Sequence, residues 1–315
     1  MSRVLVTGGA GFIGSHLVDA LVGKGHEVTV FDNFSTGREE NLSSSLSKVK
    51  VIREDILNLQ ALSQAATGTN LIYHLAAISS VPLSVDNPTE TFQVNLIGTS
   101  NVLEAARRSG IKRVVFISSA SVYGADAPVP FRETLPLEGS SPYATSKLIG
   151  EQLCNLYRRL YGLETVALRL FSVYGPRQNP RSQYANVIPA FSTRLLRGEA
   201  PVIYGTGKQT RDFIFVGDVV KALWVAGRKN GINGEVINFG SGRQTTVLQL
   251  LALISKSLRI DIPPQFAPAK PGDDPRTCAD TRKARRVLGI EKLTPLESGL
   301  KKTCTWFRQL HEAGS

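Results

Sequence analysis

The chain has 315 residues, of which 42% are hydrophobic and 20% charged, and its net charge is +11. This composition excludes fibrous and intrinsically disordered proteins and is typical of a globular protein with a full core. Three cysteines without C-x-x-C spacing and four isolated histidines indicate neither a disulfide framework nor a metal site.

The sequence also bears on location. No run approaches the roughly 18 consecutive apolar residues that cross a bilayer. The first residues lead directly into an apolar strand, without the long apolar stretch and small-residue cleavage site of a signal peptide. We therefore expect a cytoplasmic protein with no membrane partner.

The excess of positive charge has two interpretations. Lys and Arg residues are spread along the chain and are not interleaved with aromatic residues, which argues against nucleic acid as a partner. The charge then represents either a solvated basic surface or a field that attracts a dianionic ligand and raises its encounter rate.

Short apolar runs alternate with longer amphipathic stretches through the first half of the chain. The runs predict strands at 3–7, 27–31, 49–53, 71–75, 114–118 and 165–169. The stretches between them have helical spacing at 14–25, 59–66, 90–109 and 143–161. This βαβ alternation predicts an α/β fold, a Rossmann-like doubly wound parallel sheet covered by helices on both faces.

The alternation ends after Phe171, where Gly, Pro, Arg and Asn accumulate over 173–181. Further helices are predicted at 185–197, 216–226 and 246–258, with a closing amphipathic helix at 296–311. At about 150 residues per domain, we expect two units. The first is a dinucleotide-binding domain over 1–171, and the second is a smaller α/β lobe over 172–315, partly interleaved with the first.

A glycine pattern, G-x-x-G-x-x-G, follows the first predicted strand. Gly8, Gly11 and Gly14 lack a Cβ, so the turn can be tight and the backbone can approach a pyrophosphate at the amino terminus of the next helix. An ordinary tight turn is the alternative. Asp32, at the end of the second strand and about 20 residues on, favours dinucleotide binding, since its carboxylate would accept hydrogen bonds from a ribose and repel a 2′-phosphate. We therefore predict NAD as the cofactor.

Polar residues that follow the second and third strands extend this site. Asn33, Ser35 and Gly37 form a polar turn that would wrap the ribose, and Asp55 and Ile56 would hold the adenine. Each of them alone is equally consistent with plain turn chemistry.

Tyr143 and Lys147 lie four residues apart, on one face of a predicted helix. A phenol with a pKa near 10 is a poor base. A nearby ammonium group and a nicotinamide ring would lower that pKa and make proton transfer feasible. The pair follows the predicted strand 114–118, which leads into Ser119, and the hydroxyl of Ser119 would bond the reacting group. Asn95 is either a support for the cofactor or a buried capping amide.

These motifs together resemble the extended short-chain dehydrogenases/reductases that modify nucleotide sugars. The resemblance spans nearly the whole chain and is carried by residues 7–14, 32–33, 55–56, 74–77, 118–119, 143–147 and 211–213. It implies that Tyr143, Lys147 and Ser119 are catalytic. It also implies that NAD contacts Tyr143, Lys147, Asn95 and further residues of the glycine loop and of the fourth strand's end, namely Phe12, Ile13, Leu75, Ala76 and Ala77.

The resemblance further implies a UDP-sugar substrate. Arg211, Arg276 and Lys270 would supply cations for a pyrophosphate. Asn186 and Val187 would border the uracil, and Asp273 its ribose. The remaining substrate contacts implied are Ser79, Ser119, Tyr143, Ser172, Gln178 and Thr277.

The residues after Ser119 bear on the reaction. In this family the 4,6-dehydratases carry an acidic pair directly after that position, and the UDP-glucuronate decarboxylases commonly carry Glu two residues after it. Ala120 and Ser121 occupy these places here. The pattern therefore resembles a UDP-hexose 4-epimerase that oxidises C4 transiently with tightly bound NAD.

Two departures from the family pattern leave the sugar open. Ser172 replaces a frequent Asn, and Thr277 stands where epimerases restricted to unacetylated sugars have Tyr, so both UDP-Glc/UDP-Gal and UDP-GlcNAc/UDP-GalNAc are expected substrates. Ser172 also resembles some UDP-glucuronate epimerases, with Arg177 or Arg181 as partner of the carboxylate.

Two alternatives to the hexose epimerase remain. One is a UDP-glucuronate epimerase or decarboxylase, and the other is a non-catalytic NAD-sensing module, a class that usually lacks the Tyr/Lys pair. The resemblance also implies a homodimer that packs two helices per subunit, at 90–109 and 143–161.

Overall fold

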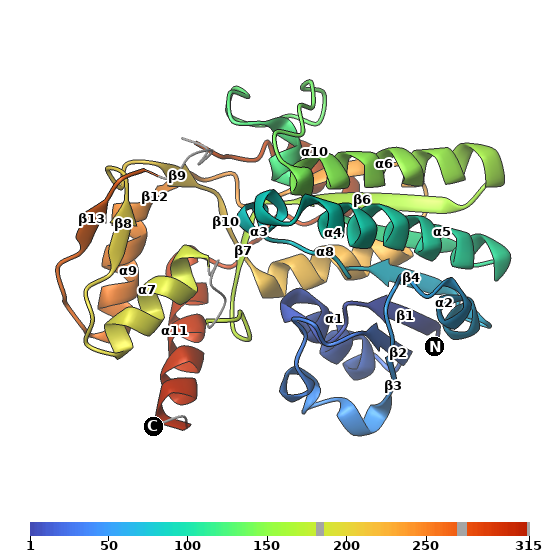
Figure 1. Ribbon diagram of the computed structural model, residues 1–315, viewed down its shortest axis with the longest axis horizontal. Coiled ribbons are helices and arrows are strands. Elements are labelled where there is room, and N and C mark those ends of the chain that lie inside the picture. The colour runs from blue at the N-terminus through green and yellow to red at the C-terminus, as the bar shows by residue number, and fades with distance from the viewer. Residues whose placement is uncertain (181–185, 270–275, 314–315) are drawn as a thin grey trace.

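A computed structural model describes residues 1–180, 186–269 and 276–313. Its centre is a seven-stranded parallel sheet in the order β11-β6-β5-β4-β1-β2-β3 (Figure 1). The strands are β1 (Arg3–Thr7), β2 (Glu27–Asp32), β3 (Val49–Arg53), β4 (Leu71–His74), β5 (Arg113–Ser119), β6 (Glu164–Leu170) and β11 (Val236–Phe239). The order reverses between β1 and β4, which is where ligands bind in doubly wound sheets. The prediction of a Rossmann-like parallel sheet is confirmed.

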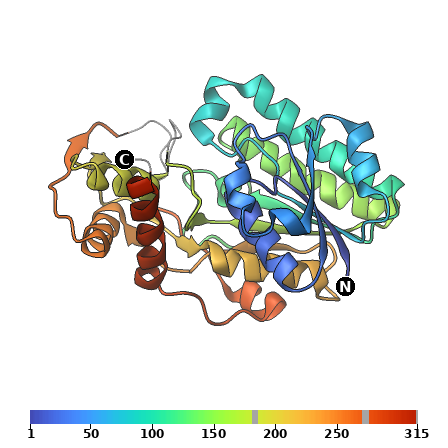
Figure 2. The ribbon, with the colours of Figure 1, turned by 90° about the horizontal axis from the view of Figure 1, so that it is seen from below.

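Helices cover both faces of this sheet (Figure 2). One face carries α1 (Phe12–Gly23), α8 (Val216–Arg228) and α10 (Arg282–Leu288). The other carries α2 (Leu59–Ala66), α5 (Gly98–Arg108) and α6 (Pro142–Tyr161). Apolar residues at helical spacing make these contacts, as with Leu17, Val18 and Leu21 of α1, which are all buried. Both faces of the sheet are therefore covered mainly by apolar side chains.

The later part of the chain forms a second hydrophobic core. Its helices are α7 (Val187–Leu196), α9 (Val247–Leu258) and α11 (Leu296–Ala313). Short strand pairs surround them: β8 (Val202–Tyr204) with β13 (Gln265–Ala267), β9 (Thr210–Arg211) with β12 (Thr245–Thr246), and β7 (Ser172–Tyr174) with β10 (Phe213–Phe215). In Figure 1 this lobe lies beside the carboxyl ends of the sheet strands. Meanwhile α8, α10 and β11 return from the later half of the chain to the large sheet.

The predicted helix at 90–109 is interrupted. It begins as α4 (Pro88–Phe92), passes through a π-helical turn (Gln93–Ile97) and continues as α5, while a further short helix, α3 (Val81–Asp86), precedes it. Three short 3-10 segments, Glu39–Leu42, Leu46–Lys48 and Ala120–Tyr123, complete the described secondary structure. Such π-helical turns within helices are frequent at functional sites, and Asn95 in this turn is buried.

Within the described ranges, no helix is both long and apolar enough to cross a membrane.

Candidate active site

The glycine loop between β1 and α1 is shaped by close backbone approaches. Gly8 has φ +69°, and a Cβ on it would lie 2.6 Å from the backbone nitrogen of Ala76. A Cβ on Gly14 would lie 2.1 Å from the carbonyl oxygen of Gly8. The helix α1 is fully described. Its first turn contains no acidic residue, and its N-cap residue, Gly11, has no side chain that could cap the helix. The first N–H groups of α1 are therefore suited to an anion.

Asp32 closes the same loop from the end of β2. Its two carboxylate oxygens accept hydrogen bonds from the backbone N–H of Ala10, at 2.9 Å, and of Phe34, at 2.8 Å. A Cβ on Gly37 would come within 2.8 Å of that carboxylate. Burial raises the pKa of Asp32, and the two backbone hydrogen bonds oppose this shift. Asp32 thus both orders the loop and leaves a carboxylate at the position where the ribose is expected.

Around Asp32 the polar turn forms a small network. Asn33 donates from Nδ2 to Oδ2 of Asp55 at 2.7 Å and accepts at Oδ1 from the backbone N–H of Ser35 at 3.0 Å. Ile56 is buried against Gly98. The structure therefore brings the residues predicted for the adenosine half of NAD to one edge of the sheet, after β1, β2 and β3.

Asn95 uses its amide to fix the segment that follows β4. Its Oδ1 accepts from the N–H of Ile78 at 2.9 Å, and its Nδ2 donates to the carbonyl of Ile78 at 3.0 Å and to Oγ of Ser146 at 2.9 Å. Of its two sequence-based interpretations, this geometry favours a structural amide that ties residues 75–80 to α6. Ser79 lies in this segment and is exposed.

His74 lies beneath that segment as a fully buried neutral imidazole. Nδ1 lies 2.8 Å from Oγ1 of Thr7 and Nε2 lies 3.0 Å from Oγ1 of Thr99. Burial lowers the pKa of His74 to about 3, with the charge of Lys147 acting in the same direction. His74 therefore stays neutral in the folded chain at pH values where an exposed histidine is protonated.

This predicts a specific acid sensitivity. Between pH 6.5 and about 3 the unfolded chain binds a proton at His74 that the folded chain does not, so folding stability falls as the pH falls. Between pH 7 and pH 5 the loss attributable to His74 should be about 2 kcal/mol. His74→Asn keeps hydrogen-bonding groups but does not titrate. Its free energy of unfolding, measured with urea at pH 7 and at pH 5, should not show this loss of about 2 kcal/mol. An equal loss in both proteins would contradict the assignment.

The residues predicted to be catalytic lie where the end of β5 packs against α6. Three successive residues of β5 each contact a different polar residue of that helix. The carbonyl of Ile117 accepts from Nζ of Lys147 at 2.9 Å, Oγ of Ser118 donates to Glu151, and Ser119 is hydrogen-bonded to the hydroxyl of Tyr143. The structure thus brings Ser119, Tyr143 and Lys147 together, as expected. Glu151 lies one helical turn beyond Lys147 on α6, but no motif in the sequence points to it.

Burial dominates the protonation of this group. It raises the pKa of the Tyr143 hydroxyl above its usual range, and the hydrogen bond with Ser119 opposes that shift. It lowers the pKa of Lys147 to about 8, against the effects of Cys154 and Glu151. The Lys147 ammonium lies 5.9 Å from the centre of the Tyr143 ring. In the chain by itself, burial therefore favours the protonated phenol of Tyr143. The expectation that Lys147 and a nicotinamide ring together lower this pKa concerns the site with NAD bound and stays a prediction.

A buried ion pair anchors α6 behind these residues. Arg169 of β6 donates to both oxygens of Glu151, at 2.9 and 2.7 Å, and both side chains are less than a tenth exposed. Arg169 also donates to the hydroxyl of Tyr123 at 2.7 Å, and that hydroxyl donates to Oδ1 of Asn238 at 2.7 Å. Ser84 of α3 accepts from the backbone N–H of Tyr143 at 3.1 Å. The sequence offered no signal for these long-range partners.

The predicted substrate residues occupy the neighbouring edge of the second lobe. Ser172 begins β7, two residues after Leu170, which is aligned with Ser119 in the sheet. Gln178 is buried, donates to the carbonyl of Val173 at 3.3 Å, and has no partner for its Oε1 among the described residues. Asn186 and Val187 form the start of α7.

Arg211, Arg276 and Thr277 are brought together around β9. Thr210 forms a bridge with Arg276, and the backbone N–H of Asp212 donates to Oγ1 of Thr277 at 3.3 Å. The buried carboxylate of Asp212 accepts from four donors in residues 241–242 and 279. It therefore fixes the strand that presents Arg211. Lys270 and Asp273 lie outside the described residues.

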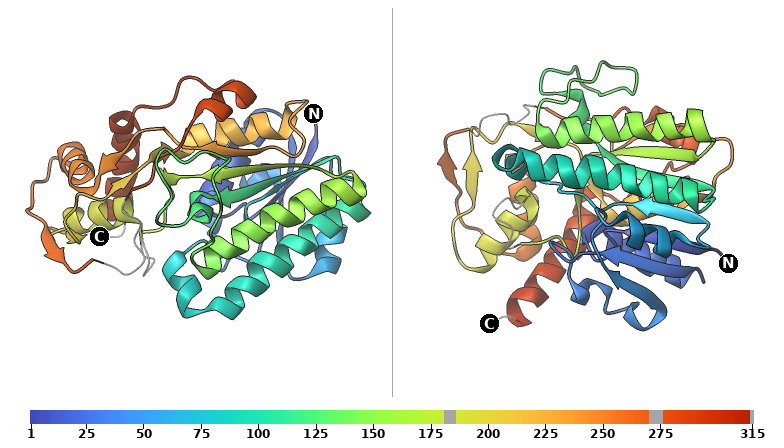
Figure 3. Two further views of the ribbon diagram at one scale, coloured as in Figure 1. Left: turned by 90° about the horizontal axis from the view of Figure 1, so that it is seen from above. Right: turned by 45° about the vertical axis from the view of Figure 1, so that its right-hand side comes forward.

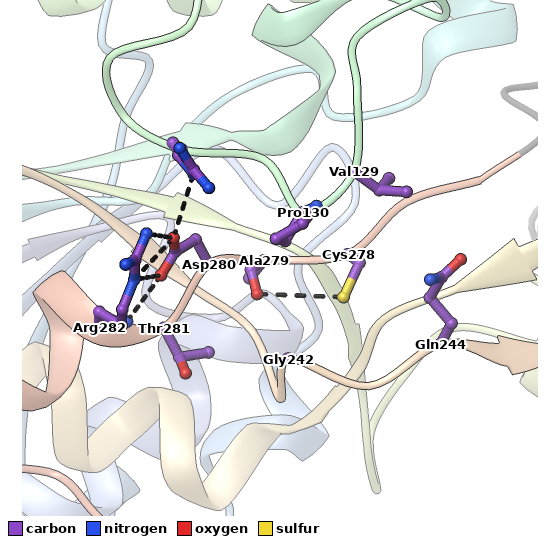
Figure 4. A pocket seen from close by; sticks show the side chains of 10 residues that line it. Val129, Pro130, Gly242, Gln244, Cys278, Ala279, Asp280, Thr281 and Arg282 are labelled. Carbon is purple, nitrogen blue, oxygen red and sulfur yellow. Dashed lines mark hydrogen bonds and ion pairs between the residues drawn. The ribbon is translucent and has the colours of Figure 1, made fainter.

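Two features near this edge do not match a substrate role. Arg177, expected as a possible partner for a sugar carboxylate, donates instead to Oδ2 of Asp19 on α1 at 2.7 Å. A pocket of about 380 Å³ lies beside Asp280, which pairs with Arg132 and Arg282, and Figure 4 shows Val129 and Gln244 on its wall. None of the predicted site residues lines that pocket.

The class of protein follows from comparison with known families. The model of the NAD dependent epimerase/dehydratase family matches residues 4–240, and the chain belongs to this family. The predicted resemblance and the predicted cofactor, NAD, are thereby confirmed.

Individual relatives of the chain include both epimerases and decarboxylases. The chain is 41% identical to a UDP-glucose 4-epimerase of Mycolicibacterium smegmatis over 310 residues, which cover 97% of this chain and 98% of the relative. It is 36% identical to a UDP-N-acetyl-alpha-D-glucosaminuronate decarboxylase of Bacillus cytotoxicus, with 98% of each chain covered. The structure of a UDP-N-acetylglucosamine 4-epimerase from Methanobrevibacter ruminantium, in complex with UDP-N-acetylmuramic acid, superposes with TM-score 0.94 and 38% identity, covering 98% and 99% of the chains.

The glycine loop provides a test of cofactor binding. In Gly14→Ala the new methyl group would lie 2.1 Å from the carbonyl oxygen of Gly8, so the loop must shift. We expect NAD to bind at least about tenfold more weakly, a loss of roughly 1.4 kcal/mol or more. Gly23→Ala is the matched control, because a Cβ there meets nothing within 4 Å. NAD can be quantified in both purified variants by chromatography after denaturation; equal contents would contradict the role of Gly14.

Proposed function

We propose that this protein is a UDP-hexose 4-epimerase that uses tightly bound NAD. The observation that carries the proposal is the Ser119, Tyr143 and Lys147 group at the carboxyl end of β5, which has no carboxylate at position 120 or 121. The glycine loop follows β1 at the same edge of the parallel sheet. Within the described 3-10 turn Ala120–Tyr123, Ser121 accepts a hydrogen bond from Oγ of Ser119 at 3.0 Å. By resemblance, family members that eliminate water carry an acidic pair at this point, and those that release carbon dioxide commonly carry a Glu.

The residues have distinct tasks in this mechanism. NAD, when bound, supplies the reversible hydride acceptor for C4 of the sugar. Tyr143 removes the proton of the sugar 4-hydroxyl and returns it after the 4-keto sugar has rotated to present its opposite face. Ser119 forms hydrogen bonds with both the Tyr143 hydroxyl and the sugar 4-hydroxyl. Lys147, with a pKa of about 8, is mostly protonated at neutral pH. Its charge and that of the oxidised cofactor offset the burial that raises the pKa of Tyr143.

The chain's own residues also hold the cofactor in place. The N–H groups at the start of α1 would bind the pyrophosphate, and Asp32, with Asn33 and Asp55, the adenosine half. Because the hydride returns to the same sugar, NAD is neither consumed nor released. Retention of the cofactor during purification is therefore part of the proposal.

We infer that the preferred sugars are hexoses with a neutral C6 substituent. Arg177 pairs with Asp19 through Nη2, which favours a structural role over binding a glucuronate carboxylate, while its Nη1 is buried without a partner among the described residues. Arg181 lies outside the described residues. Thr277, smaller than tyrosine, supports room for an N-acetyl group at C2, and the similarity to a UDP-N-acetylglucosamine 4-epimerase is consistent with it. UDP-GlcNAc is thus proposed beside UDP-Glc. A UDP-glucuronate decarboxylase is the second candidate, favoured by the relative in Bacillus cytotoxicus.

The test separates these activities. Purified protein is incubated separately with UDP-Glc, UDP-GlcNAc and UDP-GlcA, without added NAD, and the products are resolved by chromatography while carbon dioxide release is measured. Formation of UDP-Gal or UDP-GalNAc supports the proposal. Carbon dioxide from UDP-GlcA, with no epimer in the other tubes, would establish the second candidate instead. No turnover in any tube, even with NAD added, would leave the non-catalytic alternative.

We also propose a homodimer that buries the outer face of α5 and α6. These helices lie side by side on one side of the molecule (Figure 3). Four large apolar side chains are exposed there or beside it: Ile97 at 56%, Leu156 at 45%, Leu160 at 62% and Tyr161 at 53%. Such a cluster is typical of a protein interface.

If α5 and α6 form the dimer interface, charged substitutions on α6 should dissociate the dimer. The double substitution Leu156→Arg/Leu160→Arg would bury two unpaired cations in the interface and should yield a monomer in light scattering. Leu248→Arg, an exposed leucine of α9 in the other lobe, is the matched control and should leave the dimer intact. A wild-type protein that is monomeric at micromolar concentration would overturn this part of the proposal.

A further inference from the structure

A second pocket lies at the opposite edge of the sheet from the candidate active site. It has a volume of about 250 Å³ and is lined by residues at the amino ends of β1, β4 and β5 and at the end of α8. Since β5 is seven residues long, this pocket is about 20 Å from Ser119 at the other end of that strand. None of the residues predicted for NAD or for the UDP-sugar lines it.

Three polar side chains that line this pocket are left without full hydrogen bonding. Among the described residues, no partner exists for the hydroxyl of Tyr73, Nε1 of Trp224 or Nδ1 of His26. Tyr73 is fully buried. A buried polar atom without a partner costs roughly 1–3 kcal/mol, and three of them around one pocket indicate a ligand that supplies the partners.

The chemistry of these atoms restricts the ligand. The indole Nε1 of Trp224 is only a donor, so its partner must be an acceptor. The other ring nitrogen of His26 bonds the backbone of Ser2; in the neutral ring Nδ1 is therefore an acceptor and needs a donor. A group that carries both an acceptor oxygen and a hydroxyl satisfies both requirements.

The charges around the pocket specify an anion. Lys112, Arg113 and Arg228 line it, and among the described lining residues there is no Asp or Glu. Arg113 is engaged by Glu164 and by two backbone carbonyls, which leaves Arg228 and Lys112 as the cations for a ligand. The guanidinium of Arg228 lies 5.3 Å from the centre of the Trp224 ring, and the ammonium of Lys24 lies 4.4 Å from it.

We propose that this pocket binds a small hydroxylated phosphate, such as a sugar monophosphate, through Arg228, Lys112, Trp224, Tyr73 and His26. Phosphate oxygens would accept from Arg228, Lys112 and Nε1 of Trp224, and a ligand hydroxyl would donate to His26. The three unpaired atoms are shielded from solvent in the structure. Because Arg228 is exposed and its guanidinium lies beside the indole of Trp224, we expect phosphate binding to move this side chain.

That movement makes Trp224 a reporter. The chain has two tryptophans, Trp224 and Trp306, so Trp306→Phe leaves the indole of the pocket as the sole tryptophan fluorophore. This protein is titrated with glucose 1-phosphate and with inorganic phosphate, in the presence of excess UDP to occupy the candidate active site. Sodium chloride at matched ionic strength is the control for screening.

We expect a saturable change of Trp224 fluorescence with glucose 1-phosphate that chloride does not reproduce. Arg228→Ala should weaken the apparent affinity about tenfold or more, because it removes a charge-assisted hydrogen bond. Lys229→Ala is the matched control: it removes the same charge from the next residue, whose side chain does not line the pocket, and should change the affinity less than about twofold.

Three results would overturn the proposal: no saturable change, the same change with chloride, or equal weakening by Arg228→Ala and Lys229→Ala. Saturation by inorganic phosphate as tightly as by glucose 1-phosphate would overturn the sugar part of the ligand. Since the readout is binding at Trp224, the result is independent of whether the protein is an epimerase.

Discussion

Tyr143→Phe is expected to lower kcat for 4-epimerisation by about 10²–10⁴-fold, the usual contribution of a general acid or base. The phenyl ring keeps the packing of a buried side chain, and only the hydroxyl bonded to Ser119 is lost. NAD content and thermal stability should therefore stay close to those of the wild type. The measurement is kcat by chromatography of the UDP-sugar pair, together with the amount of NAD retained.

Tyr157→Phe is the matched control for this prediction. Tyr157 lies on the same helix, and its hydroxyl contacts Glu104 at 3.4 Å, away from Ser119. Its loss should change kcat less than about twofold, since partly exposed contacts of this kind contribute little. A Tyr143→Phe enzyme that keeps a tenth or more of the wild-type kcat would show that another group moves the proton.

The second large effect concerns stability. Glu151→Gln leaves the guanidinium of Arg169 buried without its counter-charge, and we expect the free energy of unfolding to fall by about 3–5 kcal/mol. The double variant Glu151→Gln/Arg169→Met removes the stranded charge as well and should recover a substantial part of that loss. Glu39→Gln, in an exposed pair with Arg53, is the matched control and should cost less than about 1 kcal/mol.

Denaturant unfolding of the four proteins measures these differences. If Glu151→Gln unfolds at the same denaturant concentration as Glu39→Gln, then the pair is not buried as described. Because Ser118 and Arg169 together fix Glu151, one turn from Lys147, loss of the pair should also disturb the alignment of α6 on β5. We therefore expect kcat to fall in Glu151→Gln even at temperatures where the variant is folded.

The sequence predicts the large sheet and the cofactor loop well, for physical reasons. Strands buried on both faces, such as 3–7 and 114–118, are continuous apolar runs, and the helices between them have regular spacing. Gly8 and Gly14 are required by backbone approaches of under 3 Å, which only glycine permits. Tyr143 and Lys147 are neighbours through helical geometry alone.

Other features depend on contacts that no local pattern encodes. The two-residue strands β9 and β12 are too short to leave a pattern in the sequence, and the carboxylate of Asp212 beside β9 accepts from residues 241–242 and 279. The partners of Glu151 come from β5 and β6, and Arg177 turns toward Asp19 on α1, 158 residues earlier. The raised pKa of Tyr143 follows from burial, which the sequence did not disclose.

The most direct test of the proposed mechanism is the fate of the hydrogen at C4. UDP-Glc and UDP-GlcNAc carrying deuterium at C4 are incubated separately in ordinary water with the protein and no added NAD, and the products are followed by NMR. A hydride that leaves C4 and returns within one closed site predicts a 4-epimer that keeps its deuterium in at least one tube. Absence of a 4-epimer from both tubes, or an epimer whose deuterium has been replaced by solvent hydrogen, would contradict the account.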